Sequence, residues 1–451
     1  MAANSSPTGA PARRSRFPHP HRGRPEPLRN AGRFLRVLGP GLITGAADDD
    51  PSGIGTYSQV GATYGAGMLW LALYMLPLMI SVQEMCGRIG LVTGQGIAGV
   101  VRRCYSRKIL YSAVALLLLA NTINVGADLG AMAVSTQLLL PGVPNAVLLV
   151  VFALGILALE IFVSYRQYAR VLKFLALSLL AYIITGLIIH PDWRQLLVRT
   201  IVPNIQFSPV FLALVVGMLG TTISPYLFFW QASEEVEESE LHGRLHTGSD
   251  QNRQRLALLK QLRSLRFDTV LGMVASEVTT WFIIITTSSV LNAHGITNIQ
   301  TADQAARALR PLAGPFAEAV FALGIVGTGL LAVPVLAGSA AYGIAESFGW
   351  RKGLAKTVNH ARGFYLVIGV ATLVGLAINF LGVDPIAALV YTAVINGIVA
   401  VPLLVLILRV ANNRSIMGEY TNGRLSNTVG IVTTALMGVA ALVTVVSLFW
   451  H

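Results

Sequence analysis

The sequence has little charge for its length. Charged residues make up 12% of the 451 residues and hydrophobic residues make up 54%, whereas soluble proteins carry about 25% charged residues. A soluble protein of this size needs many more charged side chains to cover its surface. The scarcity of charge excludes a soluble globular protein and a disordered chain, and it indicates an integral membrane protein in a lipid bilayer.

The sequence also has only two cysteines, Cys86 and Cys104, both near one basic segment. Two cysteines exclude a disulfide-rich scaffold, and we expect both thiols to be reduced because that segment is predicted to be cytoplasmic. Within the apolar runs, no His or Cys stands in an arrangement typical of a catalytic nucleophile. We therefore expect a protein that is not an enzyme and that has no cofactor.

Long apolar runs fill most of the chain. A helix needs about 20 consecutive apolar residues to cross a bilayer, and about eleven stretches reach that length. We therefore predict an all-α membrane protein with about 11 transmembrane helices. The expected limits are 37–60, 64–84, 109–139, 145–163, 172–190, 208–232, 267–293, 315–346, 363–381, 386–408 and 427–450.

The basic residues are distributed unevenly between these runs. The net charge is +12, but the basic residues form short clusters instead of one basic face, so no nucleic-acid partner is expected. Because Lys and Arg accumulate on the cytoplasmic side of membranes, the pattern predicts a cytoplasmic N-terminus and an external C-terminus. Residues 1–36 and alternate connections hold all but four of the 33 Lys and Arg residues, the exceptions being Arg194, Arg199, Arg307 and Arg310.

Two polar segments lie outside the runs. Residues 1–36 are rich in Arg and Pro and lack the apolar core of a signal peptide, so we predict a disordered cytoplasmic tail that is not cleaved. Residues 233–266 carry a run of glutamates followed by basic residues. We interpret this segment as a solvated cytoplasmic loop with a short helix, and a regulatory or partner-binding element is the alternative.

Few ionisable side chains fall inside the predicted spans. Such residues are costly in a membrane and are therefore candidates for function. No Lys, Arg or His lies at the centre of a span, so three adjacent aspartates have no obvious cationic partner and favour a bound cation. The residues concerned are Asp48, Asp49, Asp50, Glu84, Asp128, Glu160 and Glu277.

Two spans contain helix-breaking residues. In the first span, Pro51 removes a backbone donor and Gly53 disfavours a helix, next to Asp50. In the sixth span, Pro225 follows Ser224. The second broken span comes five spans after the first, an odd number, so the two halves run in opposite directions. Paired breaks in two inverted halves are typical of the substrate sites of secondary transporters. The alternative is that the prolines only kink two helices.

Several segments resemble one family, the NRAMP divalent-metal transporters. The resemblance covers nearly the whole chain after the tail. It implies a LeuT-like arrangement of two inverted five-helix repeats with broken first and sixth helices, here residues 37–190 and 208–408, with 427–450 as an additional helix. It also implies a membrane location, here a bacterial inner membrane. The segments are Gly39-Pro40-Gly41, Asp50-Pro51, Ala127-Asp128-Leu129, Ser224-Pro225-Tyr226 and Asp268-Thr269-Val270-Leu271-Gly272-Met273.

The resemblance implies a set of metal-binding groups. Asp50 is the first expected ligand, and Asp49 is a ligand or lines the entry path. Ser224 is a direct or water-mediated ligand, unless its hydroxyl bonds back to its own helix. The carbonyls of Ala47 and Thr221 are further expected ligands. Residues expected near the ion or along its pathway are Asp128, Tyr226, Glu277 and Asn396.

The sequence departs from the family at some of these positions. Gly53 stands where the family has Asn, and Ser224 stands where it has Met, so a soft thioether is replaced by a hydroxyl. Oxygen ligands suit hard ions such as Mg²⁺ and Mn²⁺, and a wider pocket suits a partly hydrated ion. The pattern is similar to the NRAMP-related magnesium transporters, a divergent branch of the family. We therefore expect transport of Mg²⁺, Mn²⁺ or both by alternating access.

Proton coupling is doubtful for a related reason. Tyr226 stands where the family has His and Ala131 where it has Glu, and tyrosine titrates near pH ~10. We favour uncoupled transport. A proton-coupled Mn²⁺/Fe²⁺ importer is the alternative, with protons as a second partner and Asp48, Asp49 or Glu277 in the relay. A transporter of the same fold for an organic substrate such as an amino acid is less compatible with three aspartates, which oppose an anionic group.

Overall fold

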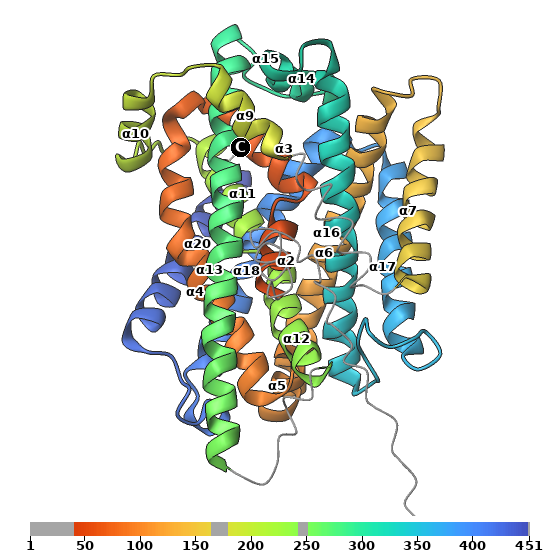
Figure 1. Ribbon diagram of the computed structural model, residues 1–451, viewed down its shortest axis with the longest axis vertical. Coiled ribbons are helices and arrows are strands. Elements are labelled where there is room, and N and C mark those ends of the chain that lie inside the picture. The colour runs from red at the N-terminus through yellow and green to blue at the C-terminus, as the bar shows by residue number, and fades with distance from the viewer. Residues whose placement is uncertain (1–39, 164–178, 242–250, 450–451) are drawn as a thin grey trace, which may run out of the picture. The chain divides into compact units, whose positions relative to one another are not determined.

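A computed structural model describes residues 40–163, 179–241 and 251–449, and every regular element in these ranges is a helix (Figure 1). The predicted tail, and the basic residues between the fourth and fifth predicted spans, lie outside these ranges. The helices of the first half are α2 (Pro40–Asp48), α3 (Pro51–Tyr64), α4 (Leu69–Thr93), α5 (Ile97–Cys104), α6 (Arg107–Gln137), α7 (Asn145–Phe162), α9 (Leu180–Ile188) and α10 (Trp193–Ile201).

The second half repeats the pattern of a broken helix followed by long helices. Its helices are α11 (Pro209–Thr222), α12 (Pro225–Leu241), α13 (Gln251–Val290), α14 (Ala302–Ala306), α15 (Arg310–Ala313), α16 (Ala317–Phe348), α17 (Arg362–Ile378), α18 (Pro385–Ala411), α19 (Arg414–Met417) and α20 (Arg424–Phe449).

Nine stretches of the described residues are long and apolar enough to cross a membrane. One of them, Pro51–Thr93, contains both α3 and α4, which a short 3₁₀ turn at Gly65–Met68 joins. It leaves out α2, because the first predicted span is interrupted before Pro51. The fifth predicted span is described only from residue 179 onward. Each of the remaining predicted spans corresponds to one helical stretch of spanning length.

Glycines allow the central helices to pack with their backbones in contact. A Cβ atom added to Gly45 of α2 would lie 2.4 Å from the carbonyl carbon of Gly272 in α13. A Cβ atom on Gly220 of α11 would lie 2.1 Å from the Ala393 carbonyl oxygen in α18. Small residues at helix contacts are how membrane helices approach closely without a hydrophobic driving force. These contacts fix α2 against α13 and α11 against α18.

The segment 233–266 differs from its expected structure. It is helical on both sides of residues 242–250, because α12 continues to Leu241 and α13 begins at Gln251. Glu235 is buried, and Glu237 accepts hydrogen bonds from the backbone N–H groups of Leu354 and Ala355. The described part is therefore helical, and none of residues 233–239 is exposed, whereas most of residues 252–266 are exposed, as expected for a solvated segment. The Glu237 side chain joins α12 to the segment after α16. A run of charged residues in the sequence does not tell such a contact from a solvated surface.

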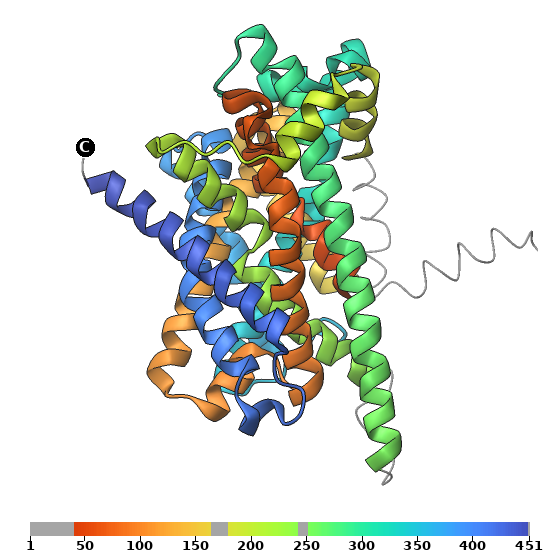
Figure 2. The ribbon, with the colours of Figure 1, turned by 90° about the vertical axis from the view of Figure 1, so that its left-hand side faces the viewer.

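The two ends of the helical bundle differ in basic residues. Arg194 and Arg199 lie on α10, and Arg307 and Arg310 lie beside α14 and α15, at the upper end in Figure 1. α5, with its basic last turn, lies at the lower end, where α13 also extends beyond its neighbours (Figure 2). The four exceptions to the basic pattern of the sequence therefore share one end of the bundle. Both cysteines are free thiols; Cys86 is buried and Cys104 is exposed.

Candidate cation site at two broken helices

The first break separates α2 from α3 at Asp49 and Asp50. Asp50 is the N-cap of α3, and its backbone is extended, with φ −69° and ψ 170°. Pro51 occupies the first helical position, where a missing N–H costs nothing. Gly53, expected within the break, instead lies in the first turn of α3, where its N–H donates to Asp50 Oδ1 at 2.7 Å. That turn keeps its helical form because the Asp50 carboxylate satisfies a backbone donor that has no partner inside the helix.

The second break separates α11 from α12 at Ile223 and Ser224, so Pro225 begins α12 as expected. The Ser224 hydroxyl lies 2.5 Å from the Gly220 carbonyl oxygen and 2.6 Å from that of Thr221. Because a hydroxyl has one proton, it donates to one of these carbonyls at a time. Ser224 therefore bonds back to its own helix, the alternative considered for it above. The carbonyl of Thr221, an expected ligand, lies in the last turn of α11, where carbonyl groups have no N–H partner within the helix.

A phenol connects the two breaks. The Tyr226 hydroxyl donates to the Ala47 carbonyl at 2.8 Å, so the first turn of α12 is joined to the last turn of α2. The Tyr226 carbonyl in turn accepts from Ser339 of α16 at 2.8 Å. Farther from the break, the hydroxyls of Tyr57 and Thr221 lie 3.0 Å apart and join α3 to α11. The last turn of α2 and the first turn of α12 thus meet at the breaks, and α2 and α11 each end there with the partial negative charge of a helix C-terminus.

Asp50 is buried, with 1% of its surface exposed, and it accepts three hydrogen bonds. Oδ1 accepts from the Ser52 hydroxyl at 2.7 Å and from Gly53 N–H, and Oδ2 accepts from Asn124 Nδ2 at 3.0 Å. The sequence analysis did not single out Asn124. Its signal is its position one turn before Asp128 on α6, which places a second polar side chain on the same face of a largely apolar helix.

The three consecutive aspartates contact different helices. Asp50 contacts α6, whereas Ser276 of α13 lies 2.7 Å from Asp48 Oδ2 and 3.2 Å from Asp49 Oδ1. Glu277, next to Ser276, is close enough to Asp49 for the two charges to interact. Asp49 and Glu277 therefore lie together on the α13 side of the break, and Asp49 is separate from the partners of Asp50. No group of three or more His, Cys, Asp or Glu side chains in the described ranges could hold a metal ion.

Other expected residues are buried beside the breaks with unused polar atoms. Neither carboxylate oxygen of Asp128, and neither amide atom of Asn396, has a hydrogen-bond partner within the described part of the chain. Asp128 lies near enough to Asp50 for their charges to interact. Asn396 precedes Gly397, and a Cβ atom on Gly220 would lie 2.3 Å from Gly397 N, so Asn396 lies alongside the last turn of α11. Buried polar atoms in native proteins rarely stay without partners, so this region suits a polar ligand.

The family assignment rests on a match along the chain. The family model described as "Natural resistance-associated macrophage protein-like", or Nramp, matches residues 41–447. This chain belongs to the Nramp family.

Relatives within the Nramp family are similar along most of their length. A protein named divalent metal cation transporter MntH from Caldanaerobacter subterraneus subsp. tengcongensis is 23% identical over 419 residues, which cover 90% of this chain and 91% of the relative. A protein of the same name from Yersinia pestis is 25% identical over 426 residues, which cover 90% and 94%. These names describe transporters and not enzymes.

Solved structures show the same fold. A mutant of the Eremococcus coleocola manganese transporter matches with a TM-score of 0.71 and 18% identity, covering 92% of this chain and 87% of that one. MhsT in complex with L-phenylalanine matches with a TM-score of 0.54 and 15% identity, covering 91% and 98%. The predicted all-α membrane fold with a LeuT-like arrangement is confirmed.

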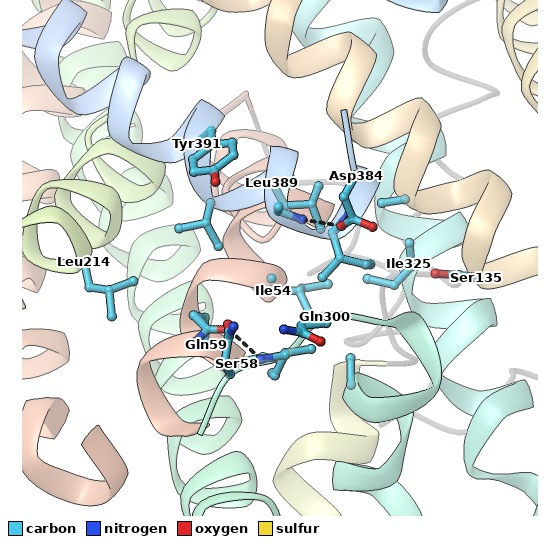
Figure 3. Close-up of a pocket in the computed structure, with 18 of the residues that line it drawn as sticks. Ile54, Ser58, Gln59, Ser135, Leu214, Gln300, Ile325, Asp384, Leu389 and Tyr391 are labelled. Atoms are coloured by element: carbon cyan, nitrogen blue, oxygen red, sulfur yellow. Dashed lines mark hydrogen bonds between the residues drawn. The ribbon is translucent and has the colours of Figure 1, made fainter. Parts of the chain in front are cut away.

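A cavity of about 620 Å³ lies on one side of the breaks in this Nramp chain. Its lining includes Gln300, Asp384 and Tyr391 (Figure 3). It also includes Ala305 of α14, which places it toward the α14 and α15 end of the bundle. Ile54, one turn after Asp50 on α3, lines its inner part. The cavity therefore reaches to within about one helical turn of the first break.

Proposed function

We propose that this chain transports divalent metal cations, with Mg²⁺ and Mn²⁺ favoured, by alternating access around the two helix breaks. The observation that carries the proposal is the buried Asp50 carboxylate at the first break, beside the end of α2 that Tyr226 of α12 joins to the second break. One carboxylate and several carbonyl oxygens form a donor set for a hard cation. The names of the MntH relatives and of the manganese transporter agree with a divalent ion as substrate.

The chemistry of the donors favours hard ions over soft ones. Asp50 and the carbonyls of Ala47 and Thr221 supply oxygen only. The Ser224 hydroxyl also offers oxygen, because it keeps its lone pairs while it donates its proton to α11. Thioether and thiolate ligands select softer transition metals, and neither is present among these four groups. Mg²⁺ dehydrates reluctantly and keeps several waters in protein sites, so a set with one carboxylate suits a partly hydrated ion.

The contacts at the breaks are compatible with entry of the ion from the α14 and α15 end of the bundle. The cavity reaches Ile54 on the α14 and α15 end, which the basic residues predict to be external. A carbonyl oxygen has two lone pairs, so Ala47 can accept from Tyr226 and still face a cation. We place the protein in a bacterial inner membrane with its N-terminus in the cytoplasm, and the cavity as the external entrance.

Transport proceeds without obligatory proton coupling in this proposal. Tyr226 donates its proton to the Ala47 carbonyl, so it serves as a structural donor. Ala131, on α6, has no ionisable group and lines the cavity. Fold likeness to MhsT does not bring an amino-acid substrate, because one fold supports many substrates and the site decides between them.

The test is uptake of Mg²⁺ and of Mn²⁺ into liposomes that contain the purified protein and an internal pH indicator. We expect uptake of both ions without internal acidification, and loss of uptake in the variant Asp50→Ala. The matched control is Asp303→Asn, because Asp303 is a partly exposed carboxylate that pairs with Arg307 on the surface.

Two results would contradict parts of the proposal. Equal uptake by Asp50→Ala and by the unmodified protein would show that the cation site is not at the first break. Acidification that follows metal entry replaces uncoupled transport with proton symport.

A further inference from the structure

We propose that Asn124 of α6 is a specificity-determining ligand of the cation site, which holds Asp50 through Nδ2 and presents Oδ1 to the divalent ion. The inference rests on the proposed function, because it names a further donor at the same site. It concerns a helix that is not broken, and a residue whose role no sequence motif indicated.

The contact geometry places the Asn124 amide at the first break. Asn124 is fully buried, and its Nδ2 lies 3.0 Å from Asp50 Oδ2. Its Oδ1 has no hydrogen-bond partner among the described residues. An unpartnered amide oxygen in a buried site is unfavourable unless a ligand or water completes it.

The carboxylate determines which way the amide faces. Asn124 could in principle be turned so that Oδ1 faces Asp50, but two acceptor oxygens would then repel each other, and a strong charge-assisted bond would be lost. The orientation with Nδ2 on Asp50 is therefore the stable one. In this orientation Asp50 occupies Nδ2, and Oδ1 stays available to a ligand that also binds Asp50.

The chemistry of Oδ1 matches what the first break lacks. Gly53 has no side chain, and a Cβ atom there would lie 3.1 Å from the Asp48 carbonyl oxygen, so α3 has little room for an amide at that position. An amide oxygen is a neutral hard donor of the kind that Ca²⁺ and Mg²⁺ sites use. Asn124 supplies such an oxygen from α6 and adds no negative charge to the site.

Asn121 offers a comparison on the same helix. It is also fully buried, and its Oδ1 also has no partner in the described ranges. Its Nδ2, however, donates to the Leu336 carbonyl of α16 at 2.9 Å, so it contacts no residue of the proposed site. An unpaired amide oxygen alone does not identify a ligand; the contact with Asp50 distinguishes Asn124 from Asn121.

The experiment compares Asn124→Ala, Asn124→Asp and the control Asn121→Ala in the full-length protein. Mg²⁺ and Mn²⁺ uptake into liposomes gives KM and maximal rate for each ion, and thermal melting in detergent with and without each ion reports binding separately. We expect Asn124→Ala to raise KM by about 10- to 100-fold, to change the Mg²⁺ to Mn²⁺ preference, and to reduce the stabilisation by metal. Asn124→Asp keeps an oxygen donor but loses Nδ2 and adds a charge beside Asp50, so without metal it should melt at a lower temperature than the unmodified protein, and metal should stabilise it more than it stabilises Asn124→Ala.

The control separates a ligand from a packing residue. Asn121→Ala is expected to lower stability without changing the ratio of the two KM values. The inference is overturned if Asn124→Ala leaves KM and the ion preference unchanged, if it behaves like Asn121→Ala, or if metal stabilises Asn124→Asp no more than Asn124→Ala. An unmodified protein that neither binds nor transports either ion would overturn the proposed function and this inference together.

Discussion

At the two helix breaks, the backbone groups that lack partners within a helix are satisfied in different ways. At each break a helix ends inside the bundle, where no bulk water is available for its last carbonyls. At the first break, the chain places aspartates and caps the next helix with Asp50. At the second break there is no carboxylate, and the Ser224 hydroxyl bonds back to the end of α11. The first break therefore contributes charge to the proposed site and the second contributes neutral oxygens and closure.

The largest expected effect concerns charge at the first break. Replacing Asp50 by asparagine keeps an oxygen that can cap α3 but removes the negative charge. We expect Asp50→Asn to lower Mg²⁺ and Mn²⁺ uptake by about 100-fold or more, since removal of even a supporting group at a metal site costs about 10- to 100-fold. Thermal melting should change little. Normal uptake by this variant would mean that the two breaks do not differ in the way described.

The next effect concerns space at the two breaks. A Cβ atom on Gly220 would meet the α18 backbone at 2.1 Å, whereas one on Gly53 would meet the Asp48 carbonyl oxygen at 3.1 Å. We expect Gly220→Ala to lower the free energy of unfolding by about 1–3 kcal/mol, the usual cost of overpacking, and Gly53→Ala to lower it by less, because its closest contact is 3.1 Å and not 2.1 Å.

Melting in detergent measures this difference, and Gly155→Ala is the control because a Cβ atom on Gly155 meets nothing within 4 Å. Equal shifts for Gly220→Ala and Gly53→Ala would show that the second break is not more tightly packed than the first.

The neutral donors of the second break should set the preference for hard ions. Replacing Ser224 by methionine introduces a polarisable thioether, which favours softer ions. We expect Ser224→Met to raise uptake of Mn²⁺ relative to Mg²⁺ by about tenfold, which corresponds to about 1.4 kcal/mol. Competition between the two ions in the liposome assay measures the ratio. Ser224→Ala is the control, because it removes the hydroxyl without adding sulfur and should not raise the ratio.

The smallest effect concerns the contact that joins the breaks. Tyr226→Phe removes the hydrogen bond to the Ala47 carbonyl, and a typical hydrogen bond contributes about 1 kcal/mol. The variant should melt at a slightly lower temperature. Its KM should fall by up to about fivefold, because the freed carbonyl no longer has to share its lone pairs with the phenol. A higher KM would show that the phenol helps to bind the ion.

Much of the fold follows from local rules that act along the chain. Pro51 and Pro225 lack a backbone N–H, so each begins a helix, and both breaks were placed by that rule alone. Gly53 was misplaced because a glycine is also compatible with a first helical turn whose donors are capped. The contacts of Glu237 were missed because its partners, Leu354 and Ala355, lie more than 100 residues away in the chain.

The candidate site could be predicted only in part. The sequence identifies Asp50 as a buried carboxylate beside a proline, since both features are adjacent in the chain. It does not tell which helix each of the three aspartates contacts, because a change of about 100° in helix rotation separates neighbouring side chains. Asn124 lies one turn before Asp128 in the sequence, but nothing local linked it to Asp50, which is 74 residues away in the chain.

The sequence by itself determined that this is a helical membrane protein, where its helices break and that the three aspartates beside the first break are buried, because hydropathy and proline chemistry act over short distances. The tertiary structure alone decided which atoms meet at the breaks. The Tyr226 bond to Ala47, the division of Asp48, Asp49 and Asp50 between α13 and α6, and the Asn124 contact each depend on how whole helices pack. Backbone contacts at glycines such as Gly45 and Gly220 set that packing, and they join residues that are far apart in the chain.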